Sequence, residues 1–139
     1  MDIRLATALD LPALVRLDSY AVAHAERQAE IAGWIDQGVC HVGDVGGEPV
    51  AYGVLTNHFF GQAFITLIVV GADHRRSGLG LRLVRHFQHI CRGSKLFTST
   101  NRSNHSMQRL LLKAGFKPSG QIDNLDDDDP ELVFFCPPA

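Results

Sequence analysis

Hydrophobic side chains recur along the chain with two different periods, which predicts a mixture of helices and strands. Apolar residues three and four positions apart predict helices over residues 11–17, 25–35, 79–91 and 107–114. Short β-branched or alternating runs predict strands over residues 2–6, 39–45, 50–55, 64–70, 96–100, near 122 and over 132–135. This order of elements is typical of a mixed α/β domain.

Residues that start or stop secondary structure mark several of these boundaries. Asp10 suits the N-cap of the first helix, and Pro12 suits its first turn. The pair Gly46-Gly47 between two predicted strands predicts a hairpin, because both positions tolerate positive φ. The continuous apolar run from Phe64 to Val70 predicts a buried central strand.

Length and composition place the chain among ordinary globular proteins. Its 139 residues are enough for one compact domain over residues 1–139, and 45% of them are hydrophobic while 20% are charged. No apolar run approaches the roughly 18 residues of a membrane helix, and the N-terminus lacks the pattern of a signal peptide. Three cysteines without a CxxC pair fit a reducing compartment, so we expect a cytoplasmic protein without membrane contact.

The net charge of −2 hides a strong asymmetry. Ten basic residues and no acidic ones lie between His74 and Ile122, and six acidic residues follow within the next ten positions. Such a split indicates an anionic ligand on the basic part of the fold. A solvated basic helix face is the alternative, and charge alone favours it.

The junction between the predicted strand 64–70 and the predicted helix 79–91 suits a pyrophosphate. A helix N-terminus offers unpaired N–H groups and a positive dipole end, and glycines let the backbone approach a phosphate oxygen. Arg75 and Arg76 add positive charge at this junction. The segment is not a Walker A loop, and its incomplete GxGxxG pattern argues against a Rossmann dinucleotide site.

Two segments of the chain resemble the motifs of the GNAT acetyltransferase family. The first motif is a strand ending in Val, then [RQ]xxGxG, then a helix, and Arg75, Gly78 and Gly80 occupy its positions after Val70. The second, N-x-x-A-x-x-L-Y-x-K-x-G-F, is matched at Asn104, Met107, Leu110, Lys113, Gly115 and Phe116. The resemblance covers nearly the whole chain. It implies a GNAT-type fold, an α+β arrangement whose central mixed, mostly antiparallel sheet is flanked by helices.

The resemblance further implies an acetyl-CoA-dependent N-acetyltransferase. By it, backbone N–H groups of the turn bind the CoA pyrophosphate, a strand segment and one asparagine bind the pantetheine arm, and the N–H of Val70 polarises the thioester carbonyl. The implied cofactor-binding residues are Ile68, Val69, Val70, Arg75, Arg76, Ser77, Gly78, Leu79, Gly80 and Asn104.

The proton donor and the general base are left open by the sequence. The reaction implied is direct transfer to a primary amine of a small molecule or peptide within a ternary complex. The motif tyrosine, often the donor to the CoA thiolate, is Leu111 here. Tyr52 is one substitute, if the fold directs it at the sulfur, and water is another. His58, expected in a loop, is a candidate proton relay, and a surface loop histidine is the competing interpretation.

The acidic segment is expected to border the acceptor. By the resemblance, Asn124, Asp126 and Glu131 contact a cationic amine, and Phe59 with Phe60 walls its slot. A solvated turn and ordinary core aromatics are the alternatives. No histidine, cysteine or acidic pattern has the spacing of a metal site, so no metal is expected.

Two other function classes compete with the enzyme. An acetyl-CoA-binding regulatory domain with little catalysis is favoured by Leu111 and by the lack of a carboxylate in the central strand. A nucleic-acid binder lacks support, because the basic segment shows neither an RNP aromatic pair nor a helix-turn-helix signal. The resemblance also raises the expectation of a homodimer.

Overall fold

The computed structural model describes residues 1–139, which fold into two compact units. The N-terminal unit comprises Met1–Leu55 and Leu67–Leu83, and the C-terminal unit comprises Thr56–Thr66 and Val84–Ala139. The chain therefore passes from one unit to the other three times. No helix is both long and apolar enough to cross a membrane.

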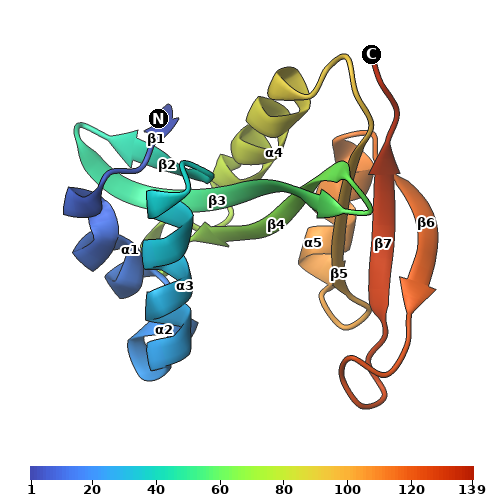
Figure 1. Ribbon diagram of the computed structural model, residues 1–139, viewed down its shortest axis with the longest axis horizontal. Coiled ribbons are helices and arrows are strands. Elements are labelled where there is room, and N and C mark those ends of the chain that lie inside the picture. Colours follow the sequence, from blue (N-terminus) through green and yellow to red (C-terminus); the bar gives the residue numbers. More distant parts are fainter. The chain divides into compact units, whose positions relative to one another are not determined.

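Seven strands form one sheet, in the order β1-β2-β3-β4-β5-β7-β6 (Figure 1). The strands are β1 (Asp2–Leu5), β2 (Cys40–Val45), β3 (Glu48–Phe59), β4 (Gln62–Val70), β5 (Leu96–Asn101), β6 (Lys117–Ile122) and β7 (Glu131–Cys136). The helices are α1 (Leu11–Leu17), α2 (Ser19–Ala23), α3 (Ala25–Asp36), α4 (Leu79–Ile90) and α5 (His105–Lys113), with 3₁₀ turns η1 (Ala8–Asp10) and η2 (Ala72–His74). β4 and β5 run parallel, whereas β1–β2, β2–β3, β5–β7 and β6–β7 are antiparallel. The predicted mixed sheet with flanking helices is confirmed.

The core of the N-terminal unit lies between its three helices and two of its strands. Figure 1 shows α1, α2 and α3 beside β2 and β3. Cys40 and Val42 alternate on one face of β2, directly opposite Val54 and Tyr52 of β3. These four side chains pack in one buried cluster with Leu14, Ala21 and Ile31 of the helices. Full burial of a valine, leucine or isoleucine side chain, such as those of Val42, Leu14 and Ile31, contributes about 1.5–3 kcal/mol to the free energy of folding.

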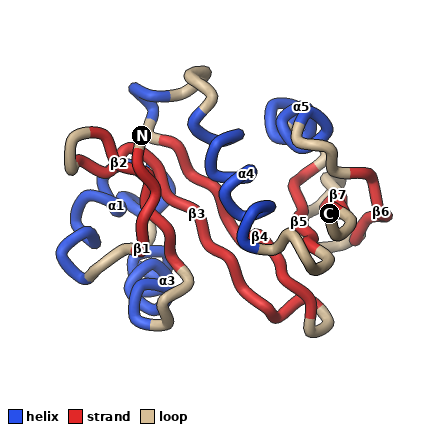
Figure 2. The backbone as a smooth tube through the Cα atoms, turned by 90° about the horizontal axis from the view of Figure 1, so that it is seen from above, coloured by secondary structure: helices blue, strands red, loops and turns tan.

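In the C-terminal unit, α4 and α5 cover one face of the sheet. Figures 1 and 2 show α5 along one side of β5 and β7. Gln88 of α4 donates hydrogen bonds to the Ala114 carbonyl after α5, at 2.8 Å, and to Cys136 Sγ in β7, at 3.5 Å. The even positions of β5 and β7 therefore face these helices, and the odd positions face the opposite side.

One short helix lies outside the sequence prediction, and one strand is longer than the strand predicted near residue 122. Helix α2 has five residues, too few to show a helical period, and starts because Asp18 accepts hydrogen bonds from the N–H groups of Tyr20 and Ala21. Strand β6 contains Pro118 and Gly120, and all six of its residues are exposed. It lies at the edge of the sheet, where proline is tolerated.

One boundary prediction is wrong, and one predicted N-cap residue stands in its place without making the expected hydrogen bond. His58 lies within β3, which continues to Phe59, and not in a loop. Asp10 occupies the N-cap position of α1 without capping that helix. Its carboxylate instead accepts hydrogen bonds from the Thr7 N–H at 2.8 Å and from the Arg4 guanidinium at 2.8 and 2.9 Å. The Arg4 guanidinium and the Thr7 N–H thus take the place of the N–H groups in the first turn of α1 that an N-cap carboxylate would accept from.

Candidate functional site

The segment between β4 and α4 is an exposed turn that its own hydrogen bonds hold in place. Residues Ala72–Gly78 are all exposed, whereas Gly71 before them is buried. The hydrogen bonds run from the Gly71 N–H to the Val50 carbonyl at 2.9 Å, from Arg75 Nε to the Val70 carbonyl at 3.2 Å, and from Ser77 Oγ to the His74 carbonyl. The turn is therefore fixed to the end of β4.

Two residues of this turn have left-handed backbone conformations. Arg76 has φ = 63° and Gly78 has φ = 82°. A non-glycine residue in this region is uncommon and costs roughly 1 kcal/mol, so the turn carries local strain at Arg76. A Cβ atom added at Gly78 would have no heavy atom within 4 Å. The space beside the Gly78 backbone is thus open to a ligand.

The N-terminus of α4 presents unpaired donors next to that open space. The first hydrogen bond of the helix runs from the Arg82 N–H to the Gly78 carbonyl at 3.1 Å. The N–H groups of Leu79, Gly80 and Leu81 therefore have no partner within the helix. With the positive end of a twelve-residue helix behind them, these groups favour an anion such as a phosphate.

Arginine side chains add charge to the same turn. Arg75 and Arg76 are exposed, whereas Arg82 donates a hydrogen bond to the Met1 carbonyl at 2.9 Å. Asp73 is the one acidic residue between β4 and α4. The predicted cofactor residues Arg75–Gly78 therefore lie in one exposed turn with surplus positive charge, and Leu79 and Gly80 are the half-buried first residues of α4. The donors and charges present fit a pyrophosphate.

The other predicted cofactor residues lie in β4 and at the start of α5. Ile68, Val69 and Val70 are the last three residues of β4, and each is half-buried. Asn104 is the N-cap of α5, where its Oδ1 accepts a hydrogen bond from the Met107 N–H at 3.2 Å. The amide nitrogen of this exposed side chain remains available to donate. Sequence reasoning missed the capping role, although Asn is a preferred N-cap residue.

Leu111 stands where the second motif has tyrosine, and its side chain is buried. It lies in α5 and is 1% exposed. An apolar side chain at this position packs into the core of the C-terminal unit and offers no proton. Position 111 therefore contributes to packing and cannot supply a proton to a reaction.

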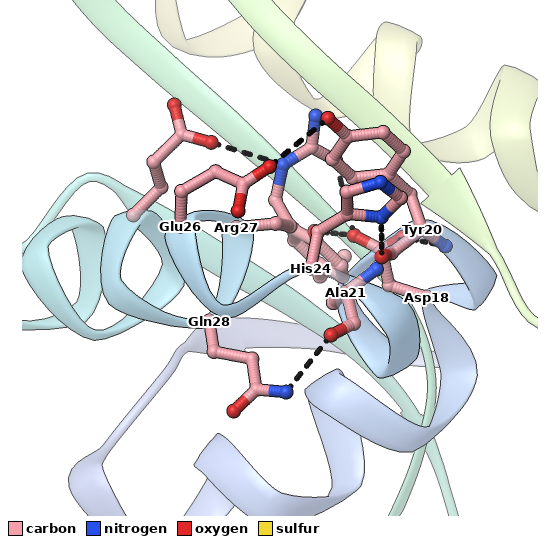
Figure 3. A network of polar contacts seen from close by, with 9 residues as sticks. Asp18, Tyr20, Ala21, His24, Glu26, Arg27 and Gln28 are labelled. Carbon is pink, nitrogen blue, oxygen red and sulfur yellow. Dashed lines mark hydrogen bonds and ion pairs between the residues drawn. The ribbon is translucent and has the colours of Figure 1, made fainter.

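The hydroxyl group of Tyr52 is engaged in a buried polar network. It donates a hydrogen bond to Asp18 Oδ2 at 2.5 Å, and Tyr52 has no exposed surface. Asp18 also accepts from Arg27 at 3.2 Å and from two N–H groups of α2 (Figure 3). Burial, followed by the hydrogen bond to Asp18, raises the pKa of Tyr52 far above its usual value. The phenol is therefore neutral and holds its proton for the carboxylate.

The predicted acceptor residues lie in the C-terminal unit. Phe59 ends β3, where its ring stacks on Phe64 at a centroid distance of 4.7 Å. His58, the residue before it, is exposed. Glu131 begins β7 and accepts a hydrogen bond from Ser99 Oγ at 2.7 Å. Asn124 is exposed between β6 and β7 with φ = 72°.

Hydrogen bonds attach the acidic loop to the end of β5. Asn101 Nδ2 donates to Asp126 Oδ2 at 2.8 Å, and Ser103 donates to Asp129 from its N–H at 3.0 Å and its hydroxyl at 2.6 Å. These bonds to Ser103 lower the pKa of Asp129. Sequence reasoning missed Asn101 and Ser103, because their partners lie more than twenty residues away. No group of three or more His, Cys, Asp or Glu side chains is placed to hold a metal ion.

Comparison with known proteins identifies relatives of the chain. Residues 10–116 match the model of the Acetyltransferase (GNAT) family. A GNAT-family acetyltransferase from Bacillus cereus is 30% identical, with a TM-score of 0.88 over 99% of this chain and 97% of that one. Ard1 from Thermoplasma volcanium has a TM-score of 0.84 at 22% identity, over 99% and 97% of the two chains.

A third structure has the same fold at lower identity. The ribosomal-protein-S18-alanine N-acetyltransferase from Escherichia coli has a TM-score of 0.78 at 21% identity, over 98% of this chain and 92% of that one. Among curated proteins no sequence matches the chain.

Proposed function

Since this chain belongs to the GNAT acetyltransferase family, we propose that it transfers an acetyl group from acetyl-CoA to a primary amine while both reactants are bound. The observation that carries the proposal is the turn between β4 and α4. It combines unpaired N–H groups, open space beside Gly78 and two exposed arginines. A pyrophosphate needs these features and an ordinary chain reversal does not.

The proposed contacts to acetyl-CoA follow from the donors that each segment offers. The N–H groups of residues 76–80 bind the pyrophosphate, and the side chains of Arg75 and Arg76 supply charge-assisted hydrogen bonds. The parallel pairing of β4 with β5 covers Ala63–Ile65, although β4 continues to Val70. The backbone of Ile68–Val70 is assigned to the pantetheine arm, and the Asn104 amide donates to it.

Acetyl-CoA supplies the acetyl group as a thioester. The Val70 N–H is assigned to the carbonyl oxygen, where a backbone donor stabilises developing negative charge. His58 is assigned to accept the amine proton, because its imidazole is exposed and an imidazole can accept a proton. The Tyr52 hydroxyl already donates a hydrogen bond to Asp18, so water is assigned as the proton donor to the leaving thiolate.

The amine acceptor is proposed to meet the acidic loop and Phe59. Carboxylates of Asp126 and Glu131 attract a cationic amine, and Asn124 lies in the same loop. The name of the Escherichia coli relative describes transfer to an alanine of a ribosomal protein. We therefore include peptide N-termini beside small amines among the acceptors. The three free cysteines agree with a reducing compartment, and the cytoplasm is our proposed location.

Thiol release from acetyl-CoA tests the function directly. The chain is mixed with acetyl-CoA and with amines, polyamines, amino acids or peptides with free N-termini, and binding of acetyl-CoA is titrated by calorimetry in parallel. Turnover with one acceptor class supports the proposal. Tight binding without turnover in every class favours the alternative, a regulatory domain that binds acetyl-CoA. Absence of binding contradicts both functions.

A further inference from the structure

Five phenylalanine rings form a continuous row across the sheet of the C-terminal unit. Phe59 contacts Phe60, Phe64 and Phe97 at centroid distances of 5.1, 4.7 and 5.3 Å, and Phe97 contacts Phe135 at 5.1 Å. We name Phe59, Phe60, Phe64, Phe97 and Phe135 the aromatic row. It crosses β3, β4, β5 and β7, which at the usual strand spacing gives a length of about 14 Å.

The aromatic row lies on the face of the sheet that α4 and α5 leave uncovered. Phe97 and Phe135 are register partners at odd positions of β5 and β7, whereas Cys136 at an even position contacts Gln88 of α4. The rings of strands β3, β4, β5 and β7 are half-buried, and Phe60 is 89% exposed. A contiguous apolar strip with an exposed end is a common mark of a binding surface.

The conformation of Phe60 is unfavourable for the turn that it occupies. Phe60 and Gly61 are the two loop residues between β3 and β4, with φ of 53° and 77°. A two-residue hairpin with positive φ at both positions favours Asn-Gly, and a bulky first residue costs local strain. Nothing in the hairpin requires an exposed ring there. A residue that strains the turn and packs little indicates a role in binding.

The same face becomes acidic toward the other end of β5 and β7. Glu131 lies four residues before Phe135 on the same face of β7, about 13 Å along the strand. Asp126 is attached beside it through Asn101, an odd position of β5. We name Asp126 and Glu131 the acidic end.

The charges of the acidic end have no cationic partner. Glu131 accepts a hydrogen bond from Ser99 and Asp126 from Asn101, both neutral donors, and neither carboxylate forms an ion pair. Arg102, which follows Asn101, donates a hydrogen bond to the Asp128 carbonyl at 3.5 Å and pairs with neither carboxylate, and Lys117 lies opposite Phe135 at the aromatic row. A ligand that follows this face therefore meets apolar rings first and negative charge afterwards.

We propose that the aromatic row and the acidic end bind an extended polypeptide segment with apolar side chains followed by a basic residue. A length of about 14 Å matches four or five extended residues and exceeds a single aryl group. That this polypeptide presents the acceptor amine rests on the proposed function. The negative charge of the acidic end disfavours an anionic membrane surface.

Peptides that cannot accept an acetyl group test the docking step alone. We use three fluorescein-labelled decapeptides with blocked N-termini and no lysine. The first has a leucine-rich half and an arginine-rich half, the second has glutamate in place of arginine, and the third has serine in place of leucine. By fluorescence anisotropy, the first should bind at least about tenfold tighter than the others, which corresponds to about 1.4 kcal/mol.

Two variants and a matched control locate the binding. Phe60→Asn should weaken the first peptide about fivefold or more while leaving the unfolding midpoint unchanged or higher, because Asn suits the turn. Glu131→Gln should weaken it about threefold. Leu9→Asn removes an equally exposed apolar side chain, 92% exposed in the N-terminal unit, and should leave binding unchanged.

Several outcomes overturn the proposal. The first is equal binding of the leucine and serine peptides. The second is wild-type affinity of Phe60→Asn for the first peptide. The third is an absence of peptide binding together with binding of phosphatidylglycerol vesicles that is lost in Phe60→Asn. Thiol release with the same peptides carrying free N-termini is measured separately. Selective docking without transfer to any amine contradicts the proposed function and leaves the docking surface standing. Transfer without selective docking contradicts this inference and leaves the function standing.

Discussion

The hydroxyl group of Tyr52 donates a hydrogen bond of 2.5 Å to the carboxylate of Asp18, and both side chains are buried. Asp18 is also the N-cap of α2 and pairs with Arg27 of α3. One carboxylate thus connects β3 with two helices of the N-terminal unit. A buried carboxylate is tolerated only when its oxygens are well hydrogen-bonded, and here every partner is a donor.

Tyr52→Phe removes one of those donors and should lower the free energy of unfolding by about 1.5–3 kcal/mol, because the bond involves a buried charge. Urea denaturation measures the loss. Tyr20→Phe is the control, since the Tyr20 hydroxyl donates to Glu26 at the exposed surface and its loss should cost less than about 0.5 kcal/mol. If Tyr52 served as the proton donor, kcat would fall far more than stability explains; we expect it to be retained.

Asp10 should make stability depend on pH in the acid range. The Arg4 hydrogen bond lowers the pKa of Asp10 below its usual value. The Asp10 carboxylate therefore stays ionised to a lower pH in the folded protein than in the unfolded chain. The stabilisation is present above the unfolded pKa of about 4 and is lost as pH falls through the folded value. In urea unfolding between pH 7 and pH 2, Asp10→Asn should flatten the acid limb.

Arg4→Met should flatten the same limb, because it removes the cation that lowers the pKa of Asp10. A steep acid limb retained in both variants would show that other carboxylates dominate this pH range.

Gly78→Glu should abolish acetyl-CoA binding in calorimetry, by at least about a hundredfold, because it fills the open space of the turn and adds negative charge. The same change also places a side chain at φ = 82°, which strains the backbone. Gly38→Glu provides the control, since Gly38 has φ = 72° and equally open surroundings at the end of α3. Normal binding by Gly78→Glu would place the pyrophosphate elsewhere.

Asn104 variants should separate helix capping from cofactor binding. Asn104→Asp keeps an acceptor for the Met107 N–H but loses the amide donor, so we expect unchanged stability and about tenfold weaker acetyl-CoA binding. Asn104→Ser should behave in the same way without the added charge. Asn104→Ala should in addition cost about 1 kcal/mol in urea unfolding. Full affinity in both capping variants would remove Asn104 from the cofactor site.

The sequence predicts the long elements well, because periodicity needs several residues to become visible. The apolar run at 64–70 and the spacing of Leu79, Leu83 and Phe87 match β4 and α4. Helix α2 is too short for such a signal, and the polar strand β6 was predicted only around its last residue, Ile122. Their formation depends on contacts distant in sequence, such as the pairing of β6 with β7.

The candidate site divides in the same way. The turn between β4 and α4 is local, so glycine spacing and two arginines were enough to predict an exposed, positively charged turn there. The partners of Tyr52, Asp126 and Glu131 lie far away in sequence, and their hydrogen bonds could not be read from neighbouring residues. The sequence singled out Phe59 and Phe60 but not the whole aromatic row, because its other rings come from three further strands.

The passage of β3 and β4 through both units has a consequence for the chain as it leaves the ribosome. All residues of the N-terminal unit have been synthesised once Leu83 is added, whereas the C-terminal unit awaits β7. During that interval Phe59, Phe60 and Phe64 lack their later ring partners, Phe97 and Phe135. During this interval the β3–β4 hairpin exposes apolar rings. It is therefore the segment where we expect aggregation to start and where a chaperone would bind.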